Sequence, residues 1–510
     1  MKISPADIVD WLRQCAPGAE LTSDSRAVNA GDAFLAYPGD FADGRRFIDD
    51  AVARGAAAVV VESVDFQRPG TPAVPNLAVP NLKQQAGLVA AQWYGMPAAD
   101  LFTIAVTGTN GKTSCTQWLA AALSRLGDPA AVIGTLGTGL YRRGVADALA
   151  ETGYTTPDAV LLQRRLRDLR TEGATALAIE ASSIGLDQGR LNGLPVQVAV
   201  FTNLTRDHLD YHGDMATYEA TKIALFDWPG LQAAIINLDD PMGLRLLARL
   251  QQARPTVAVT GYTLNDALTD VALPATSVLR ASDIRTSHIG TSFQLATEAG
   301  SMLVKTRLVG NFNVSNVLAI IGALLAKGLA LRAIIDAVEA LTAVPGRMQQ
   351  FGGQDAPLVV IDYAHTPDAL EKTLAALRAV ASQRGGKLWC VFGCGGDRDP
   401  GKRPQMGAVA MGADDVIVTS DNPRSELPAD IIAQILAGVE ASHTVPLVIE
   451  DRAAAILWAV RHAGKADVIL LAGKGHESYQ EIRGKKLPFL DADHAAIALA
   501  TRATTKGANS

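Results

Sequence analysis

The sequence has few cysteines, and they lie far apart. Only four of the 510 residues are cysteine, at positions 15, 115, 390 and 394. This number and spacing exclude the disulfide framework of a small secreted protein. Cys390 and Cys394 are the only close pair, and no cluster of His or Cys beside them completes a zinc site. We therefore expect ordinary reduced thiols.

An excess of positive charge and long apolar runs are also missing. Lys and Arg number 46 against 52 Asp and Glu, a net charge of −6, which argues against a general nucleic-acid binder. The longest apolar run, residues 317–326, ends at Lys327 and is too short for a membrane span. The first residues show no basic segment followed by an apolar stretch, so no signal peptide is expected. We expect a cytoplasmic protein without membrane insertion.

The length and the hydrophobic content suit several domains. At about 150 residues per domain, the chain corresponds to roughly three. Pro and Gly near residues 96–97 and 344–346 divide it into residues 1–98, 99–345 and 346–510. Strand-like runs alternate with helix-like segments in the second and third units, which predicts a mostly parallel sheet with helices on both faces. The first is a small α/β unit, whose Pro-rich residues 68–82 are expected to be irregular.

A glycine-containing loop lies between a predicted strand and a predicted helix. Residues 107–113 read Thr-Gly-Thr-Asn-Gly-Lys-Thr. Such a loop turns backbone N–H groups toward a phosphate at a helix N-terminus. Lys112 can reach the β- and γ-phosphates of a nucleotide, and the Thr113 hydroxyl can bind Mg²⁺. The usual P-loop has its first Gly where this chain has Val106, so the loop is a shorter variant. The alternative is a plain strand-to-helix turn with a surface lysine.

Two acidic segments follow the next predicted strands. Glu180 lies in residues 178–183, and Asp207 and His208 lie in residues 201–212. Ligands of open α/β sheets bind at the carboxyl ends of the strands, where a carboxylate and a neutral imidazole suit Mg²⁺. Glu180 alone is an ordinary strand-end carboxylate, and Lys222 alone is a solvated helix lysine. The phosphate loop favours a magnesium site for Glu180 and His208.

The third unit carries polar segments at residues 393–399, 421–426 and 473–477. Each follows an apolar strand candidate, so we expect all three at one edge of one sheet. Guanidinium groups at Arg398 and Arg424 suit carboxylates, and Glu477 suits an ammonium. Together they indicate a pocket for a zwitterionic, amino-acid-like ligand. The alternative is that they are ordinary polar turns.

The motifs, taken in their order along the chain, resemble those of the Mur ligases, an ATP-dependent family that forms amide bonds in peptidoglycan assembly. The resemblance covers nearly the full chain. It includes Asp24-Ser25-Arg26, Pro38-Gly39 with Asp43-Gly44-Arg45, residues 107–113, 180–183, 202–213, 310–316 and 345–348. It implies a central P-loop-type domain, a Rossmann-like C-terminal domain and a small N-terminal domain.

The pattern is most similar to family members that add the third amino acid to UDP-N-acetylmuramoyl-L-alanyl-D-glutamate. Residues 421–424, Asp-Asn-Pro-Arg, resemble the form found where that amino acid is meso-2,6-diaminopimelate. Arg424 can pair with the second carboxylate of diaminopimelate, whereas lysine would leave it uncompensated. The resemblance implies an acyl-phosphate intermediate, ADP and phosphate as products, and a monomer.

The resemblance also assigns roles by position. The catalytic residues it implies are Lys112, Glu180, His208 and Lys222. ATP would bind at Gly108, Thr109, Asn110, Gly111, Lys112, Thr113, Ser114, Asn316, Arg347 and Asp362. The UDP-muramoyl dipeptide would bind at Ser23, Ser25, Asp40, Phe41, Ala42, Thr155, Thr156, Ser182, Gln188 and Arg190. Diaminopimelate would bind at Arg398, Asp421, Asn422, Pro423, Arg424, Gly473 and Glu477. Two Mg²⁺ ions would be held by Thr113, Glu180, His208 and Lys222, the last as a carbamate.

The chain departs from the family pattern at two positions. Ile184 stands where many relatives have His, and Tyr154 stands where relatives often have Asn, so Tyr154 is not included in the predicted site. Three alternatives remain: a lysine-adding ligase, a folylpolyglutamate-type ligase, and a nucleotide-switched binding protein. The motifs around Ser25 and Gly44 argue against the folate enzyme, and Arg424 argues against lysine.

Overall fold

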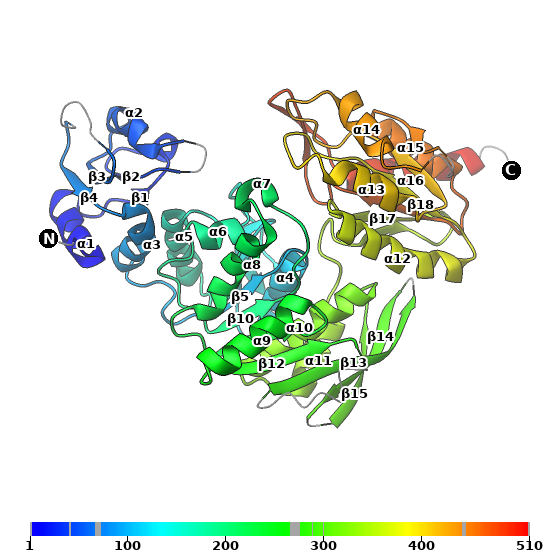
Figure 1. Cartoon of the computed structure of the whole chain (residues 1–510), viewed down its shortest axis with the longest axis horizontal. Coiled ribbons are helices and arrows are strands. Elements are labelled where there is room, and N and C mark those ends of the chain that lie inside the picture. The colour runs from blue at the N-terminus through cyan, green and yellow to red at the C-terminus, as the bar shows by residue number, and fades with distance from the viewer. Residues whose placement is uncertain are drawn as a thin grey trace.

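The computed structural model describes residues 3–39, 42–66, 73–265, 276–287, 289–298, 300–440 and 445–507. Their strands form three α/β sheets and a separate two-stranded hairpin. Successive parts of the chain form three bodies, coloured blue, cyan to green, and yellow to red in Figure 1. The prediction of three α/β units is confirmed. None of the described helices has the length and apolar character needed to cross a bilayer.

The N-terminal body is built on a parallel sheet in the order β1-β2-β3-β4. Its elements are α1 (Pro5–Cys15), β1 (Leu21–Thr22), η1 (Ser25–Ala27), β2 (Ala33–Ala36), η2 (Gly44–Phe47), α2 (Ile48–Ala53), β3 (Ala58–Glu62), β4 (Asn76–Val79) and α3 (Leu82–Trp93). One core lies between the sheet, α1 and α3, with Ile8, Val60 and Val89 fully or almost fully buried.

Strand β4 corrects one expectation. It lies inside residues 68–82, which were expected to be irregular; residues 68–72 fall outside the described residues. Pro75 and Pro80 flank β4, which is the edge strand of its sheet. A proline at the end of an edge strand removes no ladder hydrogen bond, and the Pro75 carbonyl still accepts from the Val59 N–H at 3.0 Å.

The N-terminal body docks on the central body through α3 and α5 (Ala159–Thr171). A Cβ at Gly87 would lie 2.0 Å from the carbonyl oxygen of Asn192, so only glycine permits this approach. Gly193 lies equally close, since its Cβ would be 2.6 Å from the Gly87 carbonyl oxygen. Arg167 adds an ion pair to Glu20 at 2.5 Å. Backbone therefore meets backbone at this junction.

The central body holds one large sheet, in the order β15-β14-β13-β12-β11-β10-β5-β9-β6-β7-β8. Its strands are β5 (Phe102–Thr107), β6 (Ala130–Gly134), β7 (Gly137–Arg142), β8 (Val145–Ala146), β9 (Ala176–Glu180), β10 (Val198–Phe201), β11 (Ala233–Asn237), β12 (Ala258–Thr263), β13 (Thr276–Ser287), β14 (Gly290–Thr297) and β15 (Gly300–Thr306). Its other helices are α4 (Lys112–Arg125), α6 (Ser183–Asp187), α7 (Leu209–His212), α8 (Met215–Ile223), η3 (Ala224–Asp227), α9 (Pro241–Ala253), α10 (Asn311–Ala326) and α11 (Leu331–Glu339).

The register of this sheet determines where the polar motifs meet. The strands from β13 to β6 pair in parallel, and β7, β8, β14 and β15 extend the sheet antiparallel. Val106 of β5 lies opposite Val200 of β10 and Glu180 of β9. The loops that follow these three strands therefore leave the sheet side by side. Trp118 and Ile320 belong to the core on one face, and Leu162 and Leu246 to the core on the other.

The C-terminal body has a sheet in the order β16-β17-β21-β18-β19-β20, in which only β16 is antiparallel. Its elements are β16 (Gln349–Gly352), β17 (Leu358–Asp362), α12 (Pro367–Arg384), β18 (Leu388–Phe392), α13 (Lys402–Ala410), β19 (Asp415–Val418), α14 (Pro428–Leu436), β20 (Leu447–Val448), α15 (Arg452–His462), β21 (Val468–Ala472), the hairpin β22 (Tyr479–Ile482) and β23 (Lys485–Pro488), and α16 (Asp491–Gly507). Strands β21, β18 and β19 are neighbours, so the segments after them share one edge, as predicted.

Candidate active site

The predicted phosphate loop follows β5 and leads into α4. Gly111 adopts φ +87, and a Cβ there would lie 2.6 Å from the side-chain oxygen of Asn316. The Lys112 ammonium folds over the loop and donates to the carbonyl oxygens of Gly108 at 2.9 Å and Thr109 at 2.8 Å. Burial lowers the pKa of Lys112, while Glu180 opposes that shift. The loop thus holds a cation at the N-terminus of a 14-residue helix.

Glu180 is the carboxylate beside this loop. It is fully buried at the end of β9 and accepts the Thr113 hydroxyl at 3.1 Å. Thr135, which follows β6, donates its backbone N–H to the same carboxylate at 2.8 Å. Arg347, from the C-terminal body, donates to the Thr113 hydroxyl at 3.2 Å. The structure therefore brings three predicted residues together and adds Thr135, which the sequence motifs did not indicate.

Lys222 is not the solvated helix lysine that the sequence alone favoured. It is 1% exposed, its ammonium donates to the Gly108 carbonyl oxygen at 2.9 Å, and it lies 4.2 Å from the centre of the Tyr218 ring. Burial lowers the pKa of Lys222 well below its usual value, and Lys112 adds to this. His208 packs against the same Tyr218 ring, with 6.2 Å between the ring centres.

Asp207 joins the central and C-terminal bodies electrostatically. Its carboxylate lies 3.6 Å from Nε2 of His208 and 3.9 Å from Nε2 of His365. Burial would raise the pKa of Asp207, but His208, His365 and Lys402 outweigh burial and lower it to about 2. Asp207 is therefore ionised at neutral pH, and it was not among the predicted site residues.

Oxygen donors beside the phosphate loop suit Mg²⁺. Among the described residues, no three His, Cys, Asp or Glu side chains are grouped closely enough to hold a metal alone. Mg²⁺ commonly takes one or two carboxylates and completes its shell with water and substrate phosphate. The hard oxygens of Thr113 and Glu180, in contact at the phosphate loop, fit that pattern.

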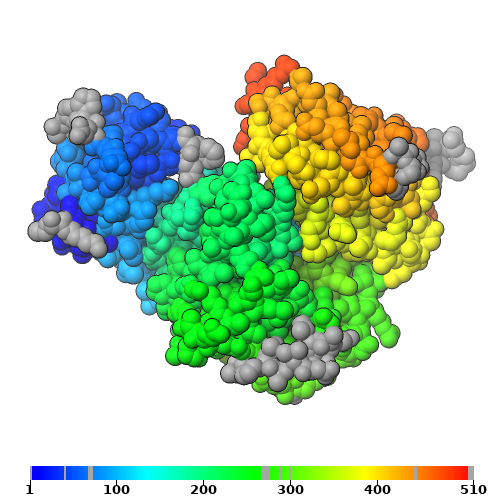
Figure 2. Space-filling view, in the orientation of Figure 1, coloured from blue at the N-terminus to red at the C-terminus, as the bar shows by residue number. Residues whose placement is uncertain are grey.

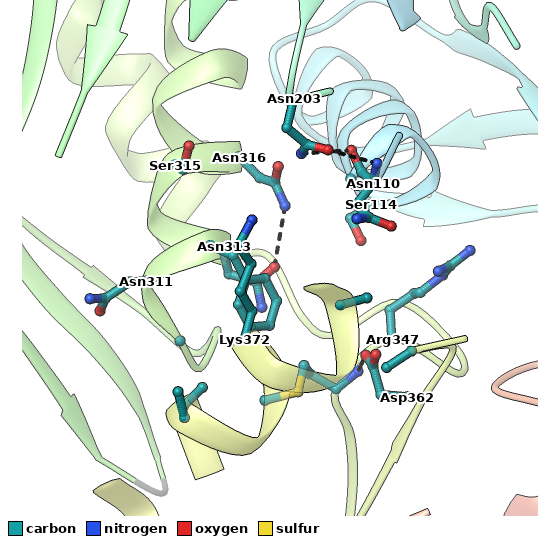
Figure 3. A pocket seen from close by; sticks show the side chains of 18 of the residues that line it. Asn110, Ser114, Asn203, Asn311, Asn313, Ser315, Asn316, Arg347, Asp362 and Lys372 are labelled. Atoms are coloured by element: carbon teal, nitrogen blue, oxygen red, sulfur yellow. Dashed lines mark hydrogen bonds between the residues drawn. The ribbon is translucent and has the colours of Figure 1, made fainter. Parts of the chain in front are cut away.

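A cavity of about 580 Å³ lies beside the loop, between the central and C-terminal bodies. Figure 3 shows Asn110 and Ser114 on one side and Arg347 and Asp362 on the other, with Asn316 projecting from α10. All five are residues predicted to bind the nucleotide. Asp362 accepts the Met348 N–H at 2.8 Å, and burial raises its pKa to about 6.

A second cavity, of about 900 Å³, lies between the N-terminal and central bodies. Five predicted residues line it: Ser23, Ser25, Ala42, Gln188 and Arg190. Asp40 and Phe41 lie outside the described residues.

Two further residues of this cavity were not predicted. Asp158, the N-cap of α5, accepts the Ser23 hydroxyl at 2.9 Å. Tyr154 lies beneath the Arg190 guanidinium at 4.9 Å. Asp158 links the N-terminal body to the central body through a side chain that no motif marked.

A row of hydroxyls leads from the second cavity to Glu180. Arg190 donates to the Thr156 carbonyl oxygen at 2.8 Å, and the hydroxyls of Thr156 and Ser182 are 2.9 Å apart. The Thr155 and Thr135 hydroxyls are 3.1 Å apart, and Thr135 contacts Glu180. Hydroxyl contacts of predicted residues, together with Thr135, thus connect the edge of the second cavity to Glu180.

In the C-terminal body, the polar segments after β19 and β21 form one hydrogen-bonded cluster. The Asn422 amide donates to the Glu477 carboxylate at 2.6 Å, and a Cβ at Gly473 would lie 2.6 Å from the Asp421 carboxylate. Lys474, which was not predicted, donates to Glu477 at 3.2 Å. The prediction that these segments come together is confirmed.

The two predicted arginines differ in their surroundings. Arg424 adopts φ +50, and its guanidinium donates to the Gly396 carbonyl oxygen at 2.6 Å. Its backbone is fixed by the hairpin β22–β23, since its N–H donates to the Glu481 carbonyl at 2.9 Å. Pro423 lies between Asn422 and Arg424, and its carbonyl oxygen accepts the Glu426 N–H at 3.0 Å. Arg398 is exposed and donates to the Asp397 carbonyl oxygen at 3.2 Å, away from the Asn422 cluster.

Polar side chains connect the central and C-terminal bodies at the entrance. Arg206 and Asp399 form an ion pair at 3.4 Å, with the arginine side chain 53% exposed. The Asn110 amide donates to Asp368 at 3.3 Å. In Figure 2, the N-terminal and C-terminal bodies face each other across a hollow above the central body. Substrates held by the two outer bodies would meet over the phosphate loop.

Three family descriptions match successive parts of the chain. They are "Mur ligase family, catalytic domain" at residues 19–94, "Mur ligase middle domain" at residues 106–324, and "Mur ligase, glutamate ligase domain" at residues 346–475. Together they match most of the three bodies described above.

Proteins named UDP-N-acetylmuramoyl-L-alanyl-D-glutamate--2,6-diaminopimelate ligase are similar over nearly the whole length. The one from Janthinobacterium sp. (strain Marseille) is 64% identical, covering 98% of this chain and 97% of its own. The one from Ralstonia nicotianae is 52% identical, covering 98% and 96%. A solved structure of a ligase with the same name is 37% identical, covers 99% of this chain and 100% of its own, and has a TM-score of 0.66.

Proposed function

Because the chain belongs to the Mur ligase family, we propose that it is the ATP-dependent ligase that joins meso-2,6-diaminopimelate to the D-glutamate of UDP-N-acetylmuramoyl-L-alanyl-D-glutamate. The observation that carries this proposal is the position of Glu180 and the phosphate loop. Loop residues line the inter-body cavity, while Glu180 accepts the Thr113 hydroxyl and lies at the end of the hydroxyl row from the second cavity. The protein would act as a monomer in cytoplasmic peptidoglycan precursor synthesis.

Each body would bind one substrate. Residues 1–98 would hold the uridine end in the cavity lined by Ser23 and Ser25, and residues 99–345 would hold ATP at the loop. Residues 346–510 would hold diaminopimelate between Glu477, Asp421 and Arg424. The described contacts support this division, since each cavity is lined by residues from two neighbouring bodies.

The first half-reaction activates a carboxylate, because its oxygen is a poor leaving group. The γ-carboxylate of D-glutamate attacks the γ-phosphate of ATP and forms an acyl phosphate and ADP. Lys112 would leave the Gly108 and Thr109 carbonyls and offset charge on the transferred group. Arg347 would add a second positive charge from the C-terminal body.

Two Mg²⁺ ions, when bound, would supply further positive charge to the phosphates. Thr113, Glu180, His208 and Lys222 would hold them. Lys222 fits this role as a carbamate, because burial lowers the pKa of its amine and thereby favours the unprotonated form, which can add CO₂. Carbamylation converts the amine into an anionic oxygen donor.

The second half-reaction forms the amide. The amine of diaminopimelate attacks the acyl carbon, and phosphate leaves. Asp421 and Glu477 would orient the ammonium end of the amino acid, and Arg424 would pair with the distal carboxylate. The products are therefore ADP and phosphate rather than AMP and pyrophosphate.

A phosphate-release assay tests the assignment directly. With ATP and the UDP-muramoyl dipeptide, diaminopimelate should start phosphate release and lysine should not, because lysine has no second carboxylate to pair with Arg424. ADP should form in equal amount to the peptide product. AMP formation, or ATP hydrolysis that does not respond to diaminopimelate, would contradict the proposal and favour a nucleotide-switched binding protein. Preference for lysine would favour the lysine-adding alternative.

Substitution of Arg424 tests the basis of amino-acid selection. Arg424→Lys should raise the KM for diaminopimelate about 10- to 100-fold, since one bidentate charge-assisted contact is lost. The KM for ATP should stay within about twofold, because the nucleotide cavity does not include Arg424. Steady-state kinetics with each substrate varied in turn measures both. Equal losses for both substrates would refute the assigned role.

A further inference from the structure

Lys474 is a fully buried lysine at the proposed amino-acid site. Its side chain is 0% exposed, although it lies in the loop directly after β21. Its ammonium donates to Oδ1 of Asn422 at 3.2 Å, Oε2 of Glu477 at 3.2 Å and the Tyr479 carbonyl oxygen at 2.6 Å. Burying an ammonium is costly unless it is paired and hydrogen-bonded, and here all three N–H donors have acceptors.

The acceptors of Lys474 are the groups expected to contact the substrate. Asn422 is 2% exposed, and it uses its amide N–H to bind Glu477 and its amide oxygen to bind Lys474. The same oxygen accepts the backbone N–H of Glu481 at 2.9 Å. The orientation of Asn422 is thus fixed from three directions, and Lys474 supplies one of them.

Lys474 also lies between two carboxylates that repel each other. Asp421, which is 8% exposed, and Glu477 belong to neighbouring loops. Burial and Asp421 raise the pKa of Glu477, and Lys474 opposes that rise. Tyr363, Cys394 and Arg452 also interact with members of this pair. Arg452 is held by Asp491 at 2.7 Å, so Lys474 is the cation in direct contact with Glu477.

We propose that Lys474 is a positioning residue for the incoming amino acid, which holds Asn422 and Glu477 in place and sets a positive charge against the Glu477 carboxylate. It does not touch the substrate, because its three donors are already used. The inference rests on the proposed function, in which Glu477 receives an ammonium group. The ε-ammonium of Lys474 would therefore act on the substrate only through Asn422 and Glu477.

The test is the variant Lys474→Met, with Lys465→Met as the matched control. Lys465 lies in the same body, is 59% exposed and pairs with Asp355. In Lys474→Met we expect the KM for diaminopimelate to rise at least about 10-fold, the loss expected for a hydrogen bond to a charged group. The kcat and the KM for ATP should stay within about twofold. Lys465→Met should match the wild type throughout.

The pH profile separates positioning from a merely structural role. A carboxyl group with a raised pKa is neutral below that pKa and anionic above it. Lys474 opposes the rise in the pKa of Glu477, so the pH dependence of the KM for diaminopimelate in Lys474→Met should be displaced toward higher pH relative to the wild type. Two KM profiles that run parallel at every pH would overturn the proposal.

A double variant shows whether Lys474 acts through Glu477. In a Glu477→Gln background, Lys474→Met should raise the KM for diaminopimelate by a smaller factor than in the wild type, because only the contact with Asn422 is then lost. The full effect in that background would overturn the proposal. If Lys474→Met does not fold, as judged by circular dichroism, Lys474→Gln replaces it; failure of both to fold would show a structural lysine and also overturn it. If the wild type itself does not use diaminopimelate, the proposed function fails instead.

Discussion

Replacing Lys112 with Met should lower the kcat for ligation by about 10³-fold, because the ammonium is the loop's own cation at the transferred phosphate. The substitution keeps most of the side-chain volume, so the effect reports the lost charge. Phosphate release under saturating substrates measures it. The KM for diaminopimelate should change little, since Lys112 lies in the central body, away from the Asn422 cluster.

The matched control for this variant is Lys305→Met, which removes an exposed lysine from β15 of the same sheet. It should retain wild-type kcat. If Lys112→Met keeps a tenth or more of the wild-type kcat, the loop is an ordinary turn, and the assignment of the nucleotide site is wrong.

Replacing Lys222 with Met should lower kcat by at least about 100-fold, if a carbamate at this position helps to hold Mg²⁺. The thioether fills the buried space above Tyr218 but offers no anionic oxygen. Small carboxylates such as formate or acetate, added at high concentration, should restore part of the activity by binding next to the methionine, where the carbamate oxygens would otherwise lie. Phosphate release with and without the carboxylate measures this.

A spectroscopic measurement checks the same carbamate without relying on activity. Wild-type protein equilibrated with ¹³C-bicarbonate should show a carbamate carbon signal by NMR, and Lys222→Met should lack it. Wild-type protein without that signal, together with a Lys222→Met variant of normal activity, would show that the buried amine is a neutral packing residue.

The loop residues were predictable from the sequence because they are contiguous. Gly108, Gly111 and Lys112 lie within five positions directly after an apolar strand, and strand-to-helix geometry places them at a helix N-terminus. The shared edge of β18, β19 and β21 was also predictable, since alternating strands and helices give a parallel sheet.

Other contacts could not be predicted, because sheet order determines them. Thr135 reaches Glu180 only because β6 lies next to β9, although 45 residues separate them. Asp158 meets Ser23 across two bodies, and Lys474 meets Asn422 across 52 residues. The burial of Lys222 also depends on tertiary packing, which its helix sequence does not show. A single residue that a neighbouring strand contributes to the site has no motif around it in the sequence, so sequence reasoning could not identify it.

The N-terminal and C-terminal bodies are attached to the central body in different ways. This difference leads us to expect a particular order of substrate binding. Gly87 and Asn192 join backbone to backbone, so the second cavity should keep its shape between turnovers. At the entrance, the C-terminal and central bodies meet through side-chain contacts such as the exposed Arg206–Asp399 pair, which contributes little free energy. We expect the sugar–peptide and ATP to load first onto a fixed platform and the amino acid to arrive last. Initial-velocity patterns should then be sequential and ordered, with diaminopimelate as the final entrant.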